Sequence, residues 1–381
     1  MTDVFEKKME AYENGTMSEE EEQAFEKELE NLELLQQRLD KKQQPSLHSR
    51  DEEKKILKRG KWKARLQTAV LALSFIIIGT VVSGILTGVY YASGNPSRTD
   101  TFYNVISYTH KITDPYAFWG GGYSQGNIFF TLDIKYDMNK QIGSDIMKIG
   151  ELKYKFFLSR MSYPEKTELG KTNKQRIPDF VHPGDRSRNP HSDWHQLEKL
   201  PDGTVASAYI SFSELLSTEE VKKRFRGKDM ELLWLAVDTG VEKDDTWMSY
   251  PPVGFPSRMP IWHEDDYIIT SQTEEKTLFG SRVISGGMVS PSGDGEEDFH
   301  RQFLKTLDYL KQYTKMADQV NYWRTLGLTE RRDYLEMYGI YHYGAVITGP
   351  TKKILELQDE EWISQLTVDE VALWNWEGRT Y

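Results

Sequence analysis

The chain has 381 residues, of which 38% are hydrophobic and 28% are charged, and its formal net charge is -11. This composition is typical of a folded protein with two or three domains, and the acidic balance gives no reason to expect direct contact with nucleic acid. The lack of cysteine excludes disulfides, thiolate metal sites, iron–sulfur clusters and a cysteine nucleophile, and we expect no cofactor.

Residues 1–50 form an acidic segment with 13 acidic and 7 basic side chains, in which two amphipathic helices are predicted. The first spans about residues 3–13 and ends at Asn14-Gly15, because these residues tolerate a left-handed cap. A capping box at Ser18–Glu21 begins the second helix, which spans about residues 19–41. The apolar faces comprise Phe5, Met9 and Tyr12 on the first helix and Phe25, Leu29, Leu32, Leu35 and Leu39 on the second.

Two helices in 50 residues cannot bury both apolar faces in a core of their own, so this segment is expected to need a partner. A structural metal is not available to it, since it contains no cysteine and a single histidine, His48. We therefore interpret residues 1–50 as a helical module that binds another protein through its apolar side chains. Self-association as a coiled coil is the alternative, although Leu34 and Gln36 disturb the heptad seam.

Residues 68–91 contain no charged side chain and are long enough for a helix that crosses a membrane. A buried core helix, the alternative, would normally be shorter and would carry a polar stripe. The preceding residues 51–67 form a basic juxtamembrane linker: residues 51–65 carry seven basic side chains, whereas residues 92–106 carry only Arg98. This asymmetry predicts a single-pass membrane protein with its N-terminus in the cytoplasm and its C-terminal domain outside the cell.

Small side chains recur at every fourth position within the predicted membrane helix, at Thr80, Gly84 and Gly88. Close backbone approach along such a row favours pairing with a second membrane helix, although glycine is also common in membrane helices for other reasons.

Residues 92–381 are predicted to form an extracytoplasmic α+β domain, which can be divided into subdomains at 92–160 and 196–381 with a polar loop at 160–197. Alternating apolar residues predict strands at 128–136, 152–158, 205–212, 230–237, 345–348 and 368–374. Helical periodicity predicts helices at 218–225, 296–326 and 351–362.

Ser124 is a candidate nucleophile, because Gly122–Gly126 matches the G-x-S-x-G pattern of serine hydrolases. That chemistry needs a buried strand before the serine and a helix after it. Here a glycine-rich turn comes before the serine, and a strand is predicted after it. We therefore assign no catalytic residue and keep a surface hydrolase that uses Ser124 as an alternative.

Two further clusters fall in predicted loops. The first collects side chains that could ligate a metal, in a proline- and serine-rich segment where such residues often gather without function, and we assign no metal site. The second collects aromatic residues suited to a glycan- or peptide-binding surface, although most aromatic side chains should be core. The clusters are His182, Asp185, His191, Asp193 and His195, and Trp247, Tyr250, Phe255 and Trp262.

Two groups of segments carry a family pattern. In the N-terminal module, Tyr12-Glu13-Asn14-Gly15 followed by Met17-Ser18 and an apolar helix resembles the N-terminal module of bacterial anti-sigma factors. Glu28, Leu32 and Leu35 stand where many such modules have zinc ligands. In the C-terminal domain the segments are LPDGTVA (200–206), AYISF (208–212), LWLAVDTG (233–240), GFP (254–256), YGAVITGP (343–350) and VALWNW (371–376). Together they resemble the sigma-factor-regulator family of membrane anti-sigma factors.

The resemblance implies a short α-helical cytoplasmic module, one transmembrane helix and an α+β extracytoplasmic domain. It implies that the module sequesters an extracytoplasmic-function sigma factor and represses its regulon, with the apolar faces of the two helices as the interface. It also implies a small multi-span membrane protein as co-regulator, which fits the face of Thr80, Gly84 and Gly88. An envelope sensor or structural membrane protein with a different partner is the second alternative.

Overall fold

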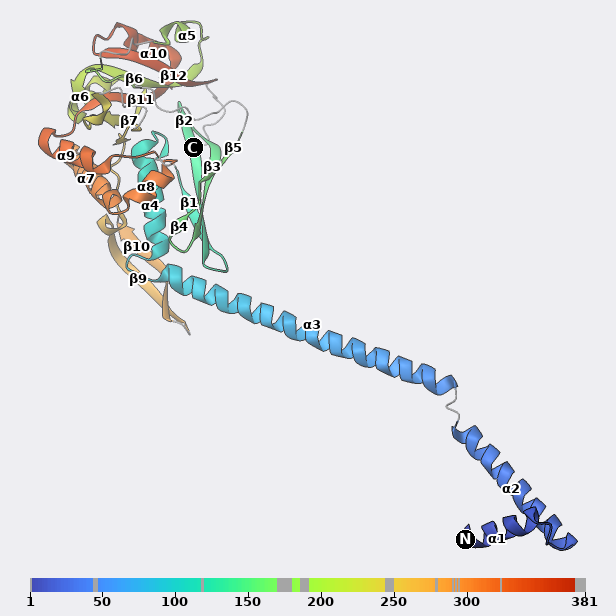
Figure 1. The fold of residues 1–381 in the computed structure, drawn as a ribbon. Helices are drawn as coiled ribbons and strands as arrows, with labels where there is room; N and C mark the ends of the chain where they lie inside the picture. The colour runs from blue at the N-terminus through green and yellow to red at the C-terminus, as the bar shows by residue number, and fades with distance from the viewer. Residues whose placement is uncertain are drawn as a thin grey trace. The chain divides into compact units, whose positions relative to one another are not determined.

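The computed structural model describes residues 2–43, 47–117, 120–169, 180–185, 192–243, 250–277, 280–289, 291, 293, 295–322 and 324–373. The chain falls into two compact units, residues 1–79 and 80–381. The described residues of the first unit are helical apart from the turn between its first two helices, and those of the second include two five-stranded antiparallel sheets, a two-stranded antiparallel hairpin and several helices (Figure 1).

The N-terminal module, residues 2–43, is a helical hairpin of α1 (Thr2–Glu13) and α2 (Glu19–Gln43), which confirms the two predicted helices. The turn between them uses Gly15 at φ 65°, a left-handed conformation that glycine adopts without steric cost. At the start of α2 the Glu21 carboxylate accepts hydrogen bonds from the backbone N–H and the hydroxyl of Ser18, at 3.3 and 2.9 Å. These bonds lower the pKa of Glu21.

Helix α3 (Leu47–Ala92) is continuous over 46 residues and includes both the basic segment and the apolar run. The segment predicted as a linker, residues 51–67, is therefore helical, in keeping with the high helix propensity of its Lys, Arg and Glu residues. Within the part of the chain that the structure describes, Glu53–Ala92 is the one stretch of helix with the length and hydropathy needed to cross a membrane.

The smaller sheet of the C-terminal domain is centred on the hairpin of β2 (Thr131–Ile142) and β3 (Asp145–Phe157). Strand β1 (Gly122–Gly126) pairs with β2, while β4 (Arg160–Met161) and β5 (Glu165–Glu168) pair with β3. Alternate residues of β2 are buried, so one face of this sheet lies on a core and the other faces solvent.

The larger sheet has the strand order β12-β6-β11-β7-β8 and is antiparallel throughout. Its central strands are buried on both faces. Helices pack on one face (Figure 1), and on the other Tyr116 and Phe180, which lie outside the helices, pack on side chains of the strands. The strands are β6 (Thr204–Leu216), β7 (Glu231–Val237), β8 (Gly254–Pro256), β11 (His342–Pro350) and β12 (Ile363–Leu373). The helices around it include α6 (Thr218–Phe225), α7 (Glu296–Gln312), α8 (Thr314–Val320), α9 (Leu328–Tyr338) and α10 (Thr351–Leu355).

Helix α4 (Arg98–Thr113) contributes side chains to the hydrophobic cores of both five-stranded sheets. Phe102 and Ile106 pack with the smaller sheet, whereas Val105 and Ile112 pack with the larger one. The remaining elements are α5 (Trp194–Glu198), the hairpin of β9 (Ile268–Thr277) and β10 (Gly280–Val289), and short 3₁₀ turns at Val241–Lys243, Glu264–Asp266 and Glu356–Asp359.

A buried cluster of three charged side chains also joins the two sheets. Lys140 at the end of β2 is 1% exposed, and its ammonium lies 2.9 Å from the carboxylate of Asp369 and 2.8 Å from that of Glu370, both on β12. The hydroxyl of Tyr116 donates a further hydrogen bond to Asp369 at 2.6 Å. Removing Lys140 would leave the carboxylates of Asp369 and Glu370 without their cation, so the cluster holds the two sheets together.

Several predicted elements have different bounds in the structure. Residues 128–130 lie in a turn and not in a strand, because Phe129 and Phe130 have φ angles of 58° and 55°. The predicted helix at 296–326 is interrupted at Tyr313 and forms α7 and α8. The predicted helix at 351–362 ends at Leu355 and continues only as a 3₁₀ turn. Trp374 lies outside the described residues.

Candidate functional site

Three of the predicted interface residues hold the N-terminal module together. The ring of Phe25 is 2% exposed and lies 5.5 Å from the rings of both Phe5 and Tyr12, measured between centroids. The Tyr12 hydroxyl also donates a hydrogen bond to Glu26 at 2.9 Å. Phe25 is therefore enclosed by the hairpin itself and not presented to a partner.

The other apolar residues of α2 remain accessible. Leu32, Leu35 and Leu39 are 46, 56 and 55% exposed, and their spacing places them on one face of the helix. Helix α1 has 12 residues and α2 has 25, so α1 lies along only the first part of α2 (Figure 1). Leu29 is half-buried at the margin of the covered part, and Met9 on α1 is 37% exposed. We call Leu32, Leu35 and Leu39 the leucine row.

The small residues of α3 are not equivalent. A Cβ added to Gly84 would lie 3.8 Å from the side chain of Ile128, a residue of the same chain, whereas a Cβ added to Gly88 would meet no atom within 4 Å. The face that contains Gly84 is therefore already in contact with the C-terminal domain, and Gly88 remains open to a neighbouring helix.

Sequence reasoning missed two residues beside this face. The hydroxyl of Ser83 accepts a hydrogen bond from the backbone N–H of Phe129 at 2.7 Å, and that of Thr87 accepts one from Phe130 at 2.9 Å. Hydroxyls four residues apart in an apolar helix were the available signal, since they lie on one face. The positive φ angles that bring the turn to them are not readable from alternation of apolar residues.

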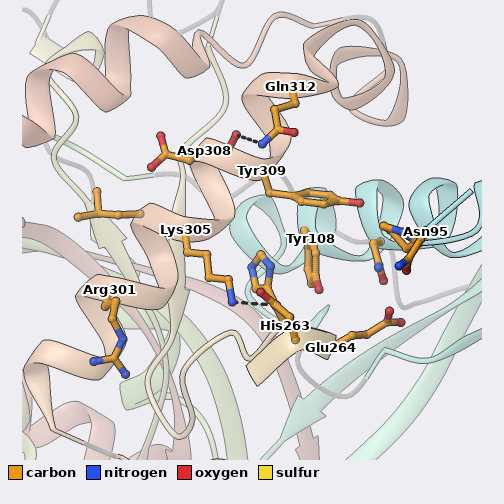
Figure 2. Close-up of a pocket in the computed structure, with 13 residues that line it drawn as sticks. Asn95, Tyr108, His263, Glu264, Arg301, Lys305, Asp308, Tyr309 and Gln312 are labelled. Carbon is orange, nitrogen blue, oxygen red and sulfur yellow. Dashed lines mark hydrogen bonds and ion pairs between the residues drawn. The ribbon is translucent and has the colours of Figure 1, made fainter. Parts of the chain in front are cut away.

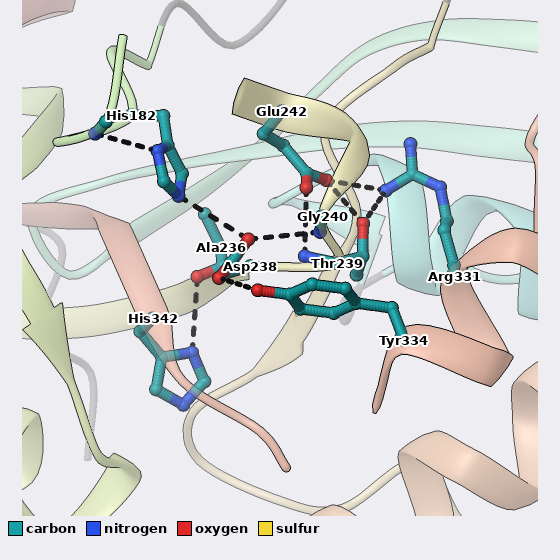
Figure 3. A network of polar contacts seen from close by, with 10 residues as sticks. His182, Ala236, Asp238, Thr239, Gly240, Glu242, Arg331, Tyr334 and His342 are labelled. Carbon is teal, nitrogen blue, oxygen red and sulfur yellow. Dashed lines mark hydrogen bonds and ion pairs between the residues drawn. The ribbon is translucent and has the colours of Figure 1, made fainter. Parts of the chain in front are cut away.

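A polar network lies at the end of β7, in the segment LWLAVDTG that contributed to the family resemblance (Figure 3). The guanidinium of Arg331, which is fully buried, donates hydrogen bonds at 2.7 Å to Thr239, Glu242 and the carbonyl of Pro251. Its Nε donates to the carbonyl of Leu326 at 2.6 Å. A buried charge that is paired and hydrogen-bonded in this way is a structural connection between α9 and the loop after β7.

Asp238 extends the network in the other direction. Its carboxylate accepts hydrogen bonds from the Tyr334 hydroxyl at 2.9 Å and from the N–H of Gly240 at 3.0 Å, and it lies 3.4 Å from Nε2 of His182. Burial acts to raise the pKa of Asp238, but the contact with His182 and the hydrogen bonds from Tyr334 and Gly240 outweigh it and hold the pKa below its usual range. Gly240 has a φ of 84°, and a Cβ there would lie 2.4 Å from the Tyr334 ring, so the motif requires glycine at this position.

An open cleft of about 810 Å³ lies between α4 and α7, beside the 3₁₀ turn at Glu264–Asp266 (Figure 2). The ring of Tyr108 stacks on that of His263 with their centroids 4.2 Å apart, and Tyr309 packs edge-on to both. Lys305 forms ion pairs with Asp265 and Asp266 at 2.8 and 2.7 Å, and burial lowers the pKa of His263 to about 4. The central histidine is therefore neutral near pH 7, and the lysine is paired with two acidic side chains.

The surroundings of Ser124 do not form a nucleophile elbow. Ser124 lies in the exposed edge strand β1, opposite Ile134 of β2, and the chain continues from β1 into a turn and β2 without a helix. That geometry lacks the strained strand-to-helix turn on which G-x-S-x-G chemistry depends.

The described histidines of the first loop cluster have separate acidic neighbours. His182 lies near Asp238, whereas His195 lies near Glu198, and His191 is outside the described residues. Across the described positions, no three His, Asp or Glu side chains are grouped to hold a metal ion. The predicted aromatic surface is wrong in two of its members: Phe255 and Trp262 are 1 and 9% exposed and belong to the interior, because β8 and the following loop pack under α4 and α7. Trp247 lies outside the described residues.

Comparison with known proteins places these features in a family context. A family model named sigma factor regulator N-terminal matches residues 54–146, and one named sigma factor regulator C-terminal matches residues 197–370. The probable anti-sigma-M factor YhdL of Bacillus subtilis (strain 168) is 28% identical over 389 residues, which cover 99% of this chain and 100% of the relative. No solved structure matches the chain. Helices α1 and α2 precede the matched regions.

Proposed function

Because the chain belongs to the sigma-factor-regulator family and is a membrane anti-sigma factor, we propose that its N-terminal module sequesters an extracytoplasmic-function sigma factor and represses the genes which that factor transcribes. The family is regulatory rather than catalytic, so the function rests on binding energy. The single observation that carries the proposal is the exposed leucine row on α2.

The leucine row supplies the affinity. Three leucines exposed by about half on one helix face leave apolar surface in water, and each contributes when a partner covers it. A helix laid into an apolar groove of a partner is a common mode of recognition, with anchors at i, i+3 and i+7. Leu29 and Met9 extend this surface at its margin, whereas Phe5, Tyr12 and Phe25 act indirectly by holding α1 on α2.

The acidic side chains of the module supply steering. Glu19, Glu20, Glu21 and Glu22 occupy the first turn of α2, and residues 1–50 carry a net charge of -6, from 13 acidic and 7 basic side chains. A sigma factor must bind nucleic acid and therefore presents basic surface, which a negative partner attracts at long range.

The chain is a single-pass membrane protein, and we propose that the module lies in the cytoplasm with the C-terminal domain outside. The seven basic residues between positions 51 and 65 support this orientation, since positive charge near a membrane helix is retained on the cytoplasmic side. Gly88, which is open, supports contact with a small membrane co-regulator along the face that it shares with Thr80 and Gly84, while Gly84 itself is already close to Ile128.

The test is a pair of aspartate substitutions in the full-length chain. Leu32→Asp with Leu35→Asp should relieve repression of the regulon, because charged side chains cannot be buried in an apolar groove without a partner. Leu34→Asp is the matched control: Leu34 is 52% exposed on the same helix, but at roughly 100° per residue it lies about 200° away from Leu32. The proposal fails if the double variant represses normally at wild-type abundance, or if Leu34→Asp relieves repression equally.

A further inference from the structure

The turn at residues 127–130 docks on the last turns of α3 through hydrogen bonds and an apolar contact. Ser83 and Thr87 accept the backbone N–H groups of Phe129 and Phe130, at 2.7 and 2.9 Å. Gly84 lies between these two hydroxyls in sequence, and its lack of a side chain leaves room for Ile128. The helix therefore satisfies the backbone of a turn that has left-handed φ angles at two non-glycine residues.

A second turn, after β3, is held at the same end of α3. The Tyr91 hydroxyl donates to the carbonyls of Phe130 and Leu158, at 2.9 and 3.1 Å, and the Tyr90 hydroxyl lies 2.9 Å from that of Ser159. The N–H of Leu158 also donates to the carbonyl of Phe130 at 2.9 Å. The two turns and the end of the helix thus form one hydrogen-bonded assembly.

Large apolar side chains nevertheless remain exposed here, two in the first turn and one at the end of β3. Ile128, Phe129 and Phe157 are 43, 55 and 55% exposed, and we call these three residues the apolar collar. The surface of α3 on either side of this contact is also apolar, since Val81 and Leu86, three residues from Gly84 and Ser83 respectively, are 56 and 49% exposed. The collar is therefore continuous with the side of the helix that lipid covers.

The depth of the collar follows from the length of the uncharged run. The last charged residue before it is Arg65, and a helix of about 20 residues crosses the hydrocarbon layer, so that layer extends to about Ile85. Ser83 and Gly84 lie just before this point, and Ile128 and Phe129 contact them. In this region a turn is tolerated only if its backbone groups are hydrogen-bonded, and Ser83 and Thr87 provide those bonds.

We propose that the apolar collar inserts into the phospholipid bilayer, at the boundary of head groups and acyl chains in the leaflet that faces the C-terminal domain. Lipid is the occupant because the collar continues the lipid-facing surface of the membrane helix at the same depth. The C-terminal domain is then attached to the membrane at two further points beside α3, which fixes its orientation to the bilayer. This inference rests on the membrane span and does not depend on which protein the N-terminal module binds.

The natural chain contains no cysteine, so single cysteines can be labelled without removing others. Phe129→Cys and Phe157→Cys are each labelled with an environment-sensitive fluorophore in the full-length chain, which is reconstituted into phosphatidylcholine vesicles. Vesicles with and without a lipid quencher attached near the glycerol end of the acyl chain are compared. Tyr123→Cys on β1 is the matched control, because Tyr123 is 54% exposed and lies at the far end of the same hairpin.

We expect the quencher to lower the fluorescence at positions 129 and 157 by at least about twofold and to leave that at position 123 almost unchanged. The quenching should not depend on the amount of protein per lipid. Equal quenching at all three positions, or none at 129 and 157, overturns the proposal. Quenching that appears only at a low protein-to-lipid ratio also overturns it, since another copy of the chain would cover the collar at the higher ratio. Position 157 keeps the test valid if cysteine disturbs the turn, because Phe157 lies in the regular strand β3.

The hydrogen bonds that hold the turn provide a second measurement. Ser83→Ala with Thr87→Val removes both acceptors while preserving the shape of the helix. We expect quenching at position 129 to fall by about half or more in this background, and unaltered quenching would overturn the role given to the two hydroxyls. Thr68→Val serves as the control, since the Thr68 hydroxyl donates only within its own helix, to the carbonyl of Ala64 at 3.0 Å.

Discussion

At the level of single residues, buried histidines link the stability of the C-terminal domain to pH. His110 is 8% exposed and hydrogen-bonded to Tyr154 at 2.6 Å, and His342 is fully buried between Thr218 and the carbonyl of Ala236. Burial lowers the pKa of His110 to about 4 and that of His342 to about 3. Both side chains are therefore neutral in the folded domain at pH values where an unfolded chain begins to protonate them.

We expect the melting temperature of the domain to fall as the pH is lowered from about 6.5 to about 4.5. Above pH 6.5 both states carry neutral histidine, so these residues give no slope. Below pH 6.5 the unfolded chain binds protons at these histidines, whereas the folded state does not. The free energy of unfolding therefore falls progressively, by on the order of 1–3 kcal/mol for each histidine. Thermal melts at a series of pH values measure this.

His195→Gln should leave the melting profile unchanged, since His195 has a side chain that is 75% exposed. A melting temperature that stays constant between pH 6.5 and 4.5 would contradict the assignment of neutral buried histidines. Carboxylates contribute little to the change in melting temperature between pH 6.5 and 4.5, because their ordinary pKa values lie below about 4.5.

Among the elements, the hairpin of α1 and α2 depends on one aromatic contact. Phe25→Ala removes the ring that packs on Phe5 and Tyr12, and truncation of a buried Phe costs about 3 kcal/mol or more. We expect the amides of α1 to exchange with solvent at close to the unfolded rate in this variant, measured by hydrogen exchange on the full-length chain. Protection of α1 equal to that in the wild-type chain would show that another contact holds the hairpin.

The control for that experiment is Leu34→Ala, a truncation of an exposed leucine on the opposite face of α2. It should leave the exchange of α1 unchanged. A loss of protection in both variants would mean that the helicity of α2 alone, and not the aromatic contact, determines whether α1 is ordered.

Elements whose ends carry a local signal could be predicted from the sequence, and those fixed by tertiary contacts could not. Helix α6 has its predicted bounds because Ser217 and Glu220 form a complete capping box. The interruption at Tyr313 has no glycine or proline to mark it, and the apolar period continues on both sides. The turn at 128–130 was predicted as strand, because its conformation depends on hydrogen bonds that its N–H groups donate to Ser83 and Thr87, which are distant in sequence.

The candidate site divides in the same way. The apolar faces of α1 and α2 are readable from helical spacing, and the family segments identified the C-terminal domain. Which of the apolar residues lie inside the hairpin is a matter of the angle at which the helices pack, so Phe25 and Leu32 look alike in the sequence and differ in exposure, 2 against 46%. The segment LWLAVDTG proves to be structural, through the network of Asp238 and Arg331.

For the whole molecule, the orientation across the membrane has a direct test. Cysteine at exposed Met337 on α9 should react with a membrane-impermeant maleimide in intact cells, whereas cysteine at Glu30 on α2 should react only after the cells are permeabilised. This follows from the basic residues that precede the apolar part of α3. The reverse pattern of labelling would place the N-terminal module outside and remove the sigma factor as its partner.

The most direct measurement is the affinity of the full-length chain, purified in detergent, for an extracytoplasmic-function sigma factor from the same cell. We expect the wild-type chain to bind one such factor with a Kd of about 1 μM or tighter, and Leu32→Asp with Leu35→Asp to weaken binding by at least about thirtyfold, since each buried anchor carries 1 kcal/mol or more. The Leu34→Asp chain should bind like wild type. No binding of any such factor by the wild-type chain, or undiminished binding by the double variant, would contradict the role of the leucine row.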